Sequence, residues 1–214
     1  MKKEFFTRTS GLLAIIIFLE GCYFPLVATG VVATAVAVTD RRTAGIILED
    51  KTIELKSMSE LSKNLPEDEV SVAVTCFNRA ALLTGWVSNE ELSKEVASLI
   101  ANVENVREII NELNIGPKAT GKMFARDTIL TAKIKASFID EEKLNANVVK
   151  VKSENGIVFL MGIVSQREAD LAADIASRVK GTKRVVKVFE VKSETEIANI
   201  DAVINSQKPK KPSK

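Results

Sequence analysis

The chemistry open to this chain is limited by the reactive side chains that it contains. The 214 residues include two cysteines, Cys22 and Cys76, and no histidine. Histidine is the commonest general base, the usual activator of serine and cysteine nucleophiles and the commonest zinc ligand. The glycine spacing of "GPKATG" at 116–121 does not fit a dinucleotide-binding turn, and no phosphate-binding loop is present. We therefore expect a non-enzymatic protein without a cofactor.

The two cysteines lie in different surroundings. Cys76 belongs to "SVAVTCF", a run rich in β-branched residues, and such a cysteine is typically a small buried apolar group. A reactive thiol is the alternative. Cys22 instead follows a basic start and the apolar stretch "GLLAIIIFL" at 11–19, with Gly21 immediately before it. This order is that of a secretory signal peptide, and the apolar stretch is shorter than the ~20 residues that cross a bilayer.

The tetrapeptide Leu19-Glu20-Gly21-Cys22 resembles the lipobox of bacterial lipoproteins, although Glu20 stands where that family has a small or apolar residue. The resemblance implies cleavage after residue 21, a diacylglycerol on the sulfur of Cys22 and an acylated amine. Several acyl chains anchor a protein stably, whereas one chain binds weakly. Tyr23, rather than aspartate, after the cysteine implies export to the outer membrane. Residues 1–21 are then a signal peptide and 22–39 a lipidated N-terminal segment.

The alternative is an uncleaved membrane anchor. The uncharged stretch "YFPLVATGVVATAVAV" at 23–38 could join the preceding apolar run as one helix. Glu20, costly within a bilayer, and Pro25 count against this interpretation.

Charge is distributed unevenly along the chain. Residues 40–115 carry 8 basic and 14 acidic side chains, a net charge of −6. Residues 119–191 carry 13 basic and 9 acidic side chains, a net charge of +4. The two halves therefore face different partners or face each other. The overall charge of +2 does not suggest a nucleic-acid-binding protein.

The two halves are also copies of one pattern. "VSVAVTCFNRAALLTGWVSNEEL", from Val70, aligns with "NVVKVKSENGIVFLMGIVSQREA", from Asn147, at an offset of about 77. The offset becomes 76 in the following helix, so the first copy has one extra residue where that helix begins. Each copy predicts a helix, two strands, a helix and a strand. The opening helices are expected at about 45–64 and 121–138 and the final strands at 106–115 and 184–191.

Short motifs set the boundaries of these elements. Asn155-Gly156 is a strong hairpin turn signal. Ser88-x-x-Glu91 and Ser165-x-x-Glu168 both fit the capping box that starts a helix. Gly85 and Gly162 fall inside the second strand of their copies, where we expect a close approach of another backbone or helix.

This pattern resembles the BON domain, and the segments "ENGIVFLMGIVSQREADLAADIASRVKG" and "TKRVVKVFEV" carry the resemblance most specifically. It implies an α+β fold of two tandem αββαβ BON modules after a lipoprotein signal peptide. The first BON domain would span 40–115, a linker 116–120 and the second BON domain 121–192. Residues 193–214 would form a C-terminal tail with a disordered basic end. With the lipobox, the chain is similar to dual BON-domain outer-membrane lipoproteins, which implies phospholipid binding, outer-membrane integrity and concentration at division sites.

The first helix of the second copy carries the candidate lipid-binding residues. Met123, Leu130, Ile134 and Phe138 share one helical face and should be core. A neighbouring face combines basic side chains with one apolar residue, which suits an anionic headgroup surface. This candidate phospholipid-binding set is Lys122, Arg126, Ile129 and Lys133. The alternative is a solvated helix face; the family places lipid contact on this helix.

Three functions follow from these features. The first is a periplasm-facing lipoprotein of the outer membrane that binds anionic phospholipid through its second BON domain. The second is an interaction adaptor whose acidic first domain docks a basic envelope-assembly protein. The third is a sensor of a small ion or ligand, which we disfavour because no calcium-binding loop is present.

Overall fold

The computed structural model describes residues 40–206. The predicted signal peptide, Cys22 and the alternative anchor helix lie outside these residues, as does the basic end of the tail from residue 207. The first module contains α3 (Ala44–Asn64), β1 (Val70–Phe77), β2 (Ala80–Val87), α4 (Glu90–Ala101) and β3 (Glu108–Ile115). The second module contains α5 (Gly121–Ile139), the short 3-10 helix η1 (Ala146–Val148), β4 (Lys150–Glu154), β5 (Ile157–Ser165), α6 (Gln166–Arg178) and β6 (Arg184–Lys192).

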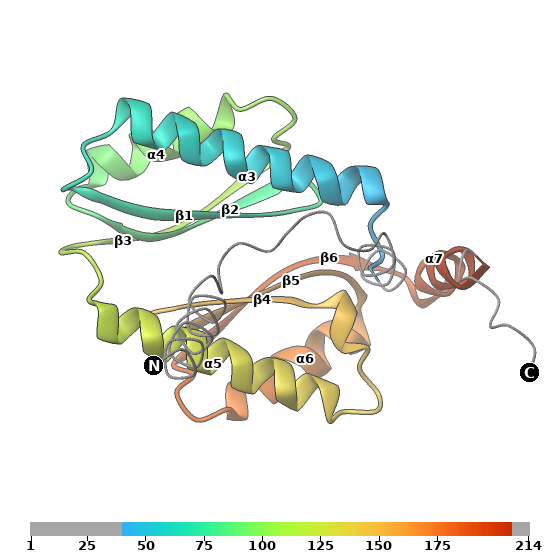
Figure 1. Cartoon of the computed structure of the whole chain (residues 1–214). Coiled ribbons are helices and arrows are strands. Elements are labelled where there is room, and N and C mark those ends of the chain that lie inside the picture. Colours follow the sequence, from blue (N-terminus) through green and yellow to red (C-terminus); the bar gives the residue numbers. More distant parts are fainter. Residues whose placement is uncertain (1–39, 207–214) are drawn as a thin grey trace, which may run out of the picture. The chain divides into compact units, whose positions relative to one another are not determined.

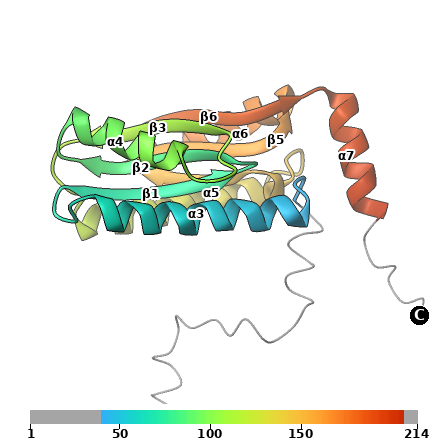
Figure 2. The same cartoon turned by 90° about the horizontal axis from the view of Figure 1, so that it is seen from above.

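Each module is a three-stranded sheet with two helices on one face (Figure 1). The strand orders are β1-β2-β3 and β4-β5-β6, with an antiparallel first pair and a parallel second pair. The predicted α+β fold of two αββαβ modules is confirmed. A further helix, α7 (Glu194–Ser206), was not predicted; in Figure 2 it follows the end of β6. None of the helices within residues 40–206 is both long and apolar enough to cross a membrane.

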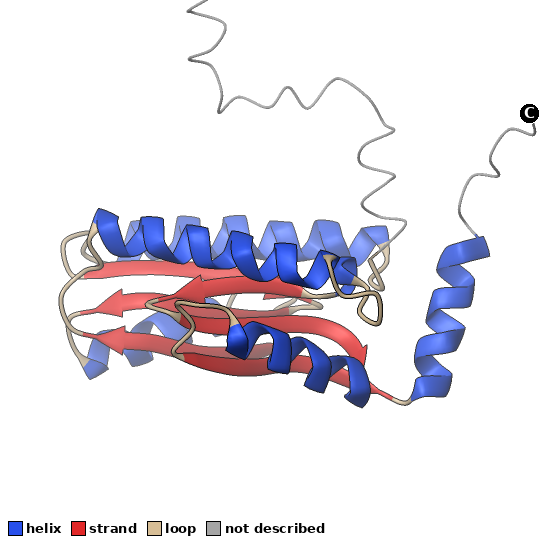
Figure 3. Ribbon diagram, turned by 90° about the horizontal axis from the view of Figure 1, so that it is seen from below, coloured by secondary structure: helices blue, strands red, loops and turns tan. Residues whose placement is uncertain are grey.

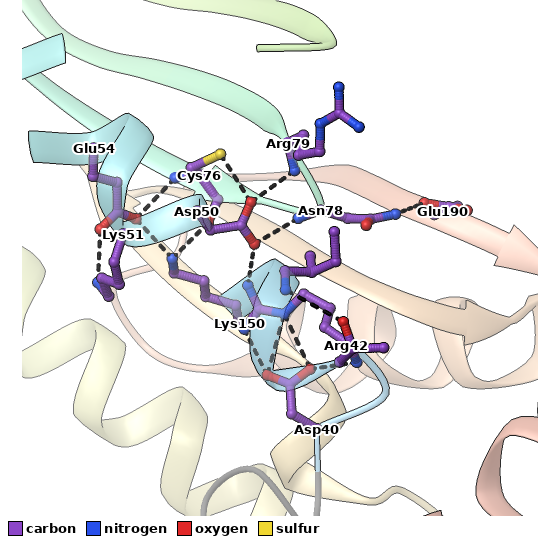
Figure 4. Close-up of polar contacts among 12 residues, drawn as sticks. Asp40, Arg42, Asp50, Lys51, Glu54, Cys76, Asn78, Arg79, Lys150 and Glu190 are labelled. Atoms are coloured by element: carbon purple, nitrogen blue, oxygen red, sulfur yellow. Dashed lines mark hydrogen bonds and ion pairs between the residues drawn. The ribbon is translucent and has the colours of Figure 1, made fainter. Parts of the chain in front are cut away.

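An aspartate on the first helix of each module holds the adjacent β-hairpin. The carboxylate of Asp127 accepts hydrogen bonds of 2.8 Å from both backbone N–H groups of the Asn155-Gly156 turn. The carboxylate of Asp50 likewise accepts from both N–H groups of the Asn78-Arg79 turn, at 2.8 and 2.7 Å (Figure 4). All four turn residues have positive φ. The helix therefore supplies hydrogen bonds that hold this turn even where glycine is missing.

The predicted capping boxes differ between the modules. Ser165 caps α6 and forms the predicted box with Glu168. The prediction for Ser88 is wrong, because Asn89 is the N-cap of α4 and accepts a 2.8 Å hydrogen bond from the N–H of Leu92. The extra residue of the first copy lies at this point, and it moves the start of the helix one position along the chain.

The two strand glycines lie against backbone, as predicted. A Cβ atom on Gly85 would stand 2.1 Å from the carbonyl oxygen of Ser71, and one on Gly162 would stand 2.4 Å from that of Val148. Gly85 also has a φ of +119°, which favours glycine. Both glycines are therefore structural.

Each module has an apolar core between its helices and its sheet, and a third cluster joins the modules. In that cluster Phe77 and Leu82 of the first module pack with Phe159, Met161 and Ile163 of the second. The modules belong to one compact unit. Each sheet thus has its two helices on one face and the other module on the opposite face. Figure 3 shows the sheets in red and the helices in blue.

Polar contacts cross the same boundary. The Nζ of Lys150 donates to Glu54 Oε1 at 3.0 Å and to the carbonyl oxygen of Cys76 at 2.9 Å (Figure 4). Arg184 of the second module pairs with Glu112 of the first at 3.0 Å. The basic second half and the acidic first half therefore do face each other, at least at these pairs.

Candidate functional site

The rotation of α5 about its axis is fixed by what it buries. Leu130, Ile134 and Phe138 are buried in the core of the second module, and Met123 is half-buried. Thr120 caps the start of the helix, accepting a hydrogen bond from the N–H of Met123. With these residues inward, the predicted phospholipid-binding residues point outward. All four, namely Lys122, Arg126, Ile129 and Lys133, are exposed.

Beside α5 lies a cleft of about 420 Å³. Its walls are α5, the Asn155-Gly156 turn and the loop at 180–183 that follows α6. Three of the four predicted residues line it: Arg126, Ile129 and Lys133. Lys122 does not. The loop adds two basic residues that the sequence analysis did not propose, Lys180 and Lys183.

The basic side chains of this cleft lack carboxylate partners. Among the ion pairs of residues 40–206, none involves Arg126, Lys133, Lys180 or Lys183. The one acidic residue of the lining is Asp127, whose carboxylate accepts the two turn N–H groups. The side-chain Nζ of Lys183 donates to the amide oxygen of Asn155, at 3.0 Å. The cleft therefore offers several positive charges to an anionic ligand.

Large apolar side chains are exposed on the same helix. Ile129 is 56% exposed, Phe124 71% and Ile139 74%. Basic and exposed apolar side chains on one helix are the combination by which interfacial helices bind membranes. Phe124 and Ile139 were missed by the sequence analysis because only the stripe at spacings of four, three and four was considered.

The first module has the corresponding elements with different side chains. Hydrogen bonds fix the register: the N–H of Arg107 donates to Arg79 O at 2.8 Å, and the N–H of Lys183 donates to Gly156 O at 2.8 Å. With Asp50 matching Asp127, this register makes Glu49, Thr52, Lys56 and Glu104 the counterparts of Arg126, Ile129, Lys133 and Lys180, respectively.

In the first module the charged counterparts are hydrogen-bonded within the domain. The Nζ of Lys56 donates to Glu104 Oε2 at 2.8 Å, and the amide of Asn105 donates to Glu49 Oε1 at 2.8 Å. The hydrogen bond and charge of Glu104 raise the pKa of Lys56. The first helix and the loop after the second helix are thus tied together in the first module, whereas in the second module both carry unpaired positive charge. The signal for Lys180 was present in the sequence, opposite Glu104 at the offset of 76.

The thiol of Cys76 is fully buried, as predicted, and donates to Asp50 Oδ1 at 3.2 Å. Burial, and secondarily the neighbouring carboxylates of Asp50 and Glu54, raise the pKa of this thiol far above its ordinary value. A thiol held protonated is a poor nucleophile. Over residues 40–206, no cluster of histidine, cysteine and carboxylate side chains could hold a metal ion.

The chain is similar to known proteins both in its two modules and over most of its length. Residues 49–117 and 126–193 each match the family described as BON domain. The chain is 39% identical over 180 residues to the outer membrane lipoprotein DolP of Haemophilus influenzae, covering 84% of this chain and 93% of that protein. It is 35% identical over 151 residues to a 21 kDa hemolysin of Actinobacillus pleuropneumoniae, covering 70% and 78%. It is 28% identical over 151 residues to the osmotically-inducible protein Y of Escherichia coli, covering 69% and 75%.

Proposed function

Because this chain belongs to the BON-domain family, with two BON domains in tandem, we propose that it is a non-enzymatic, lipid-anchored protein of the outer membrane. Its second BON domain binds anionic phospholipid through α5, and this binding supports the integrity of the membrane, with division sites as one place of action. The observation that supports the proposal most directly is the cleft beside α5, whose basic side chains form no ion pair with any carboxylate of residues 40–206.

The anchor rests on Cys22 and on the likeness to a relative named as an outer membrane lipoprotein. An acylated Cys22 would hold the chain at the membrane regardless of its domains. The role of α5 is then to fix how the second domain meets the lipid surface, rather than to supply all of the affinity.

Two physical terms contribute to that contact. Each lysine or arginine close to an anionic surface contributes about 1 kcal/mol, and this term is screened by salt over ~8–10 Å. The exposed side chain of Ile129, which lies beside the basic residues, adds a term from burial in the interface, which salt does not weaken. Binding should therefore fall with rising ionic strength to a level above zero.

Vesicle flotation tests the proposal. The chain from residue 22, with Cys22→Ala so that no acyl chain masks the domain, is mixed with vesicles of phosphatidylglycerol and phosphatidylcholine or of phosphatidylcholine alone. We expect flotation with the anionic vesicles and partial loss at high salt. Equal flotation with both compositions would contradict anionic recognition.

A second function, that of an interaction adaptor, is favoured by a different observation. Leu48, Leu55 and Met58 are exposed on α3 of the acidic first domain. An exposed apolar stripe on an acidic surface fits a basic protein partner of the envelope-assembly machinery. Photo-crosslinking from position 55 in cells would test it: a discrete adduct, lost when Leu48 and Met58 become serine, supports the adaptor, and no adduct counts against it.

A further inference from the structure

One place in the fold is filled differently in the two domains: in the first, Lys56 binds the carboxylate of Glu104, whereas Lys133 in the second has no carboxylate partner among residues 40–206. We propose that the cleft of the second domain seats a single phosphate group on Lys133, at the position that the carboxylate of Glu104 takes on Lys56 in the first domain. This deepens the proposed function by naming where a phosphate-bearing headgroup is held, and it assigns Lys180 and Lys183 to the site.

The first domain shows that an anion can be bound at this position of the fold. Lys56 occupies the same helical position as Lys133, and its Nζ holds a carboxylate oxygen at 2.8 Å. That carboxylate comes from Glu104, which lies in the loop after the second helix of the domain, as Lys180 does in the second domain. The first domain therefore fills its own anion position with a side chain. In the second domain a lysine replaces that glutamate, so no side chain of residues 40–206 fills the position and it is open to an anionic ligand.

The loop of the second domain is built to stay in place without that ion pair. Its residue at the position of Asn105 is Gly181, with a φ of +115°, so the side chain that binds Glu49 in the first domain is absent. The N–H of Thr182 donates to Val179 O at 3.0 Å, and the N–H of Lys183 donates to Gly156 O at 2.8 Å. Backbone hydrogen bonds therefore fix the loop while its lysine side chains stay available.

The charge and size of the cleft select the ligand class. Arg126 and Lys133 come from α5, and Lys180 and Lys183 from the loop, around a volume of about 420 Å³. This is within the range of small-molecule sites, and lysine and arginine are the usual partners of phosphate oxygens. Ile129 forms an apolar part of the wall. A phosphate ester with a small apolar attachment fits this lining, and both a lipid headgroup and a free phosphate ester have that chemistry.

The key variant is Lys180→Glu, which gives the second domain the residue of the first. Its carboxylate would pair with Lys133 and close the cleft without changing the fold. The matched control is Lys143→Glu, the same charge change at an exposed residue of the second domain outside the cleft. Calorimetry on the acylated full chain in neutral detergent micelles measures binding of sn-glycerol 3-phosphate and inorganic phosphate. Phosphatidylglycerol added to the same micelles measures the lipid form.

We expect Lys180→Glu to weaken binding of these probes by about tenfold or more, as expected for loss of one charged hydrogen bond, and Lys143→Glu to leave it within about twofold. If binding is lost for phosphatidylglycerol alone, the site recognises a lipid headgroup. If it is lost for all three probes, the site recognises the phosphate group itself.

The site is disproved if Lys180→Glu binds every probe as the wild type does. Failure of the phosphate site can be distinguished from failure of the proposed function. If the chain still floats with anionic vesicles after Lys180→Glu, α5 binds the surface without a seated headgroup. If the wild type does not float at all, the proposed function itself fails.

Discussion

The guanidinium of Arg41 lies 2.7 Å from the carboxylate of Glu168, although the two residues are far apart in the chain. Their side chains are only 3% and 7% exposed. Arg41 also donates to Asp201 of α7 and to the carbonyl oxygen of Ile163, both at 2.9 Å. Glu168 in addition accepts the N–H of Ser165, as part of the capping box of α6. One arginine thus fastens the segment before α3 to three parts of the chain around the second domain.

We therefore expect Arg41→Met to destabilise the protein strongly. It would leave Glu168 buried without its cation, and breaking a buried pair in this way costs about 3–5 kcal/mol. The free energy of unfolding in urea measures the loss. Arg178→Met is the control, because Arg178 pairs with Asp174 in an exposed position and should change stability by less than about 1 kcal/mol. Similar losses in the two variants would show that the Arg41 contacts contribute little.

The same pair predicts how stability depends on pH. Burial alone would raise the pKa of Glu168, but hydrogen bonds from Arg41 and from the Ser165 N–H, and the charge of Arg41, hold it below its ordinary value. A carboxyl with a lowered pKa stabilises the folded state above about pH 4.3, its value in the unfolded chain, and this contribution is lost as the pH falls through the folded value.

Wild type and Glu168→Gln should accordingly differ most in unfolding free energy at neutral pH. The difference should narrow in urea titrations as the pH falls below about 4.3, the value of the carboxyl in the unfolded chain. A difference that stays constant from pH 7 to pH 3 would mean that the ionised form of Glu168 is not the form that Arg41 stabilises.

The strand glycines give a third prediction. Gly162→Ala would place a Cβ within 2.4 Å of Val148 O, and Gly85→Ala would meet Ser71 O at 2.1 Å in a strained backbone conformation. We expect each to lower the free energy of unfolding by about 2 kcal/mol or more. Gly121→Ala, at the start of α5 with nothing near its Cβ position, is the control and should be neutral or slightly stabilising. A Gly162→Ala variant as stable as the control would show that β5 can move away from Val148 at little cost.

Lipidation of Cys22 is tested chemically. Intact-mass analysis of the protein isolated from membranes should show a chain that begins at Cys22 and carries two or three acyl chains. Cys22→Ala should leave the precursor uncut and absent from the outer membrane. An unacylated wild type of full length would favour the uncleaved anchor helix instead.

Most of the fold could be predicted because the same pattern of helices and strands occurs in both copies of the repeat. The opening helices lie within about one residue of their expected bounds, and the positions of Gly85 and Gly162 predicted the close backbone approach. The start of α4 could not be placed, since Ser88 and Asn89 are both good caps and only the inserted residue of the first copy decides between them. Helix α7 was missed because it lies beyond the repeat, although its signals were present: Ile197, Ile200 and Ile204 stand at helical spacing, and Ser193-x-x-Glu196 forms a capping box before them.

The sequence predicted the residues that α5 contributes to the candidate site, but not those of the loop at 180–183. A helical period placed Arg126, Ile129 and Lys133 on one face, because residues three and four apart on a helix are neighbours. Lys180 and Lys183 belong to a loop whose position depends on tertiary contacts, such as the hydrogen bond from Lys183 to Gly156, which no local pattern encodes. The apolar cluster that contains both Leu82 and Phe159 could not be predicted either, because an apolar strand face does not identify what covers it.

The central claim is that α5 of the second domain binds anionic phospholipid, and flotation of matched variants tests it most directly. In the Cys22→Ala chain that begins at residue 22, Arg126→Glu with Lys133→Glu should reduce flotation with phosphatidylglycerol-containing vesicles, and adding Ile129→Asp should reduce it further. The counterpart changes in the first domain, Thr52→Asp with Lys56→Glu, should have little effect. Circular dichroism confirms that each variant is folded. If the folded triple variant floats as well as its parent, α5 is a solvated helix face and the adaptor function becomes the better account.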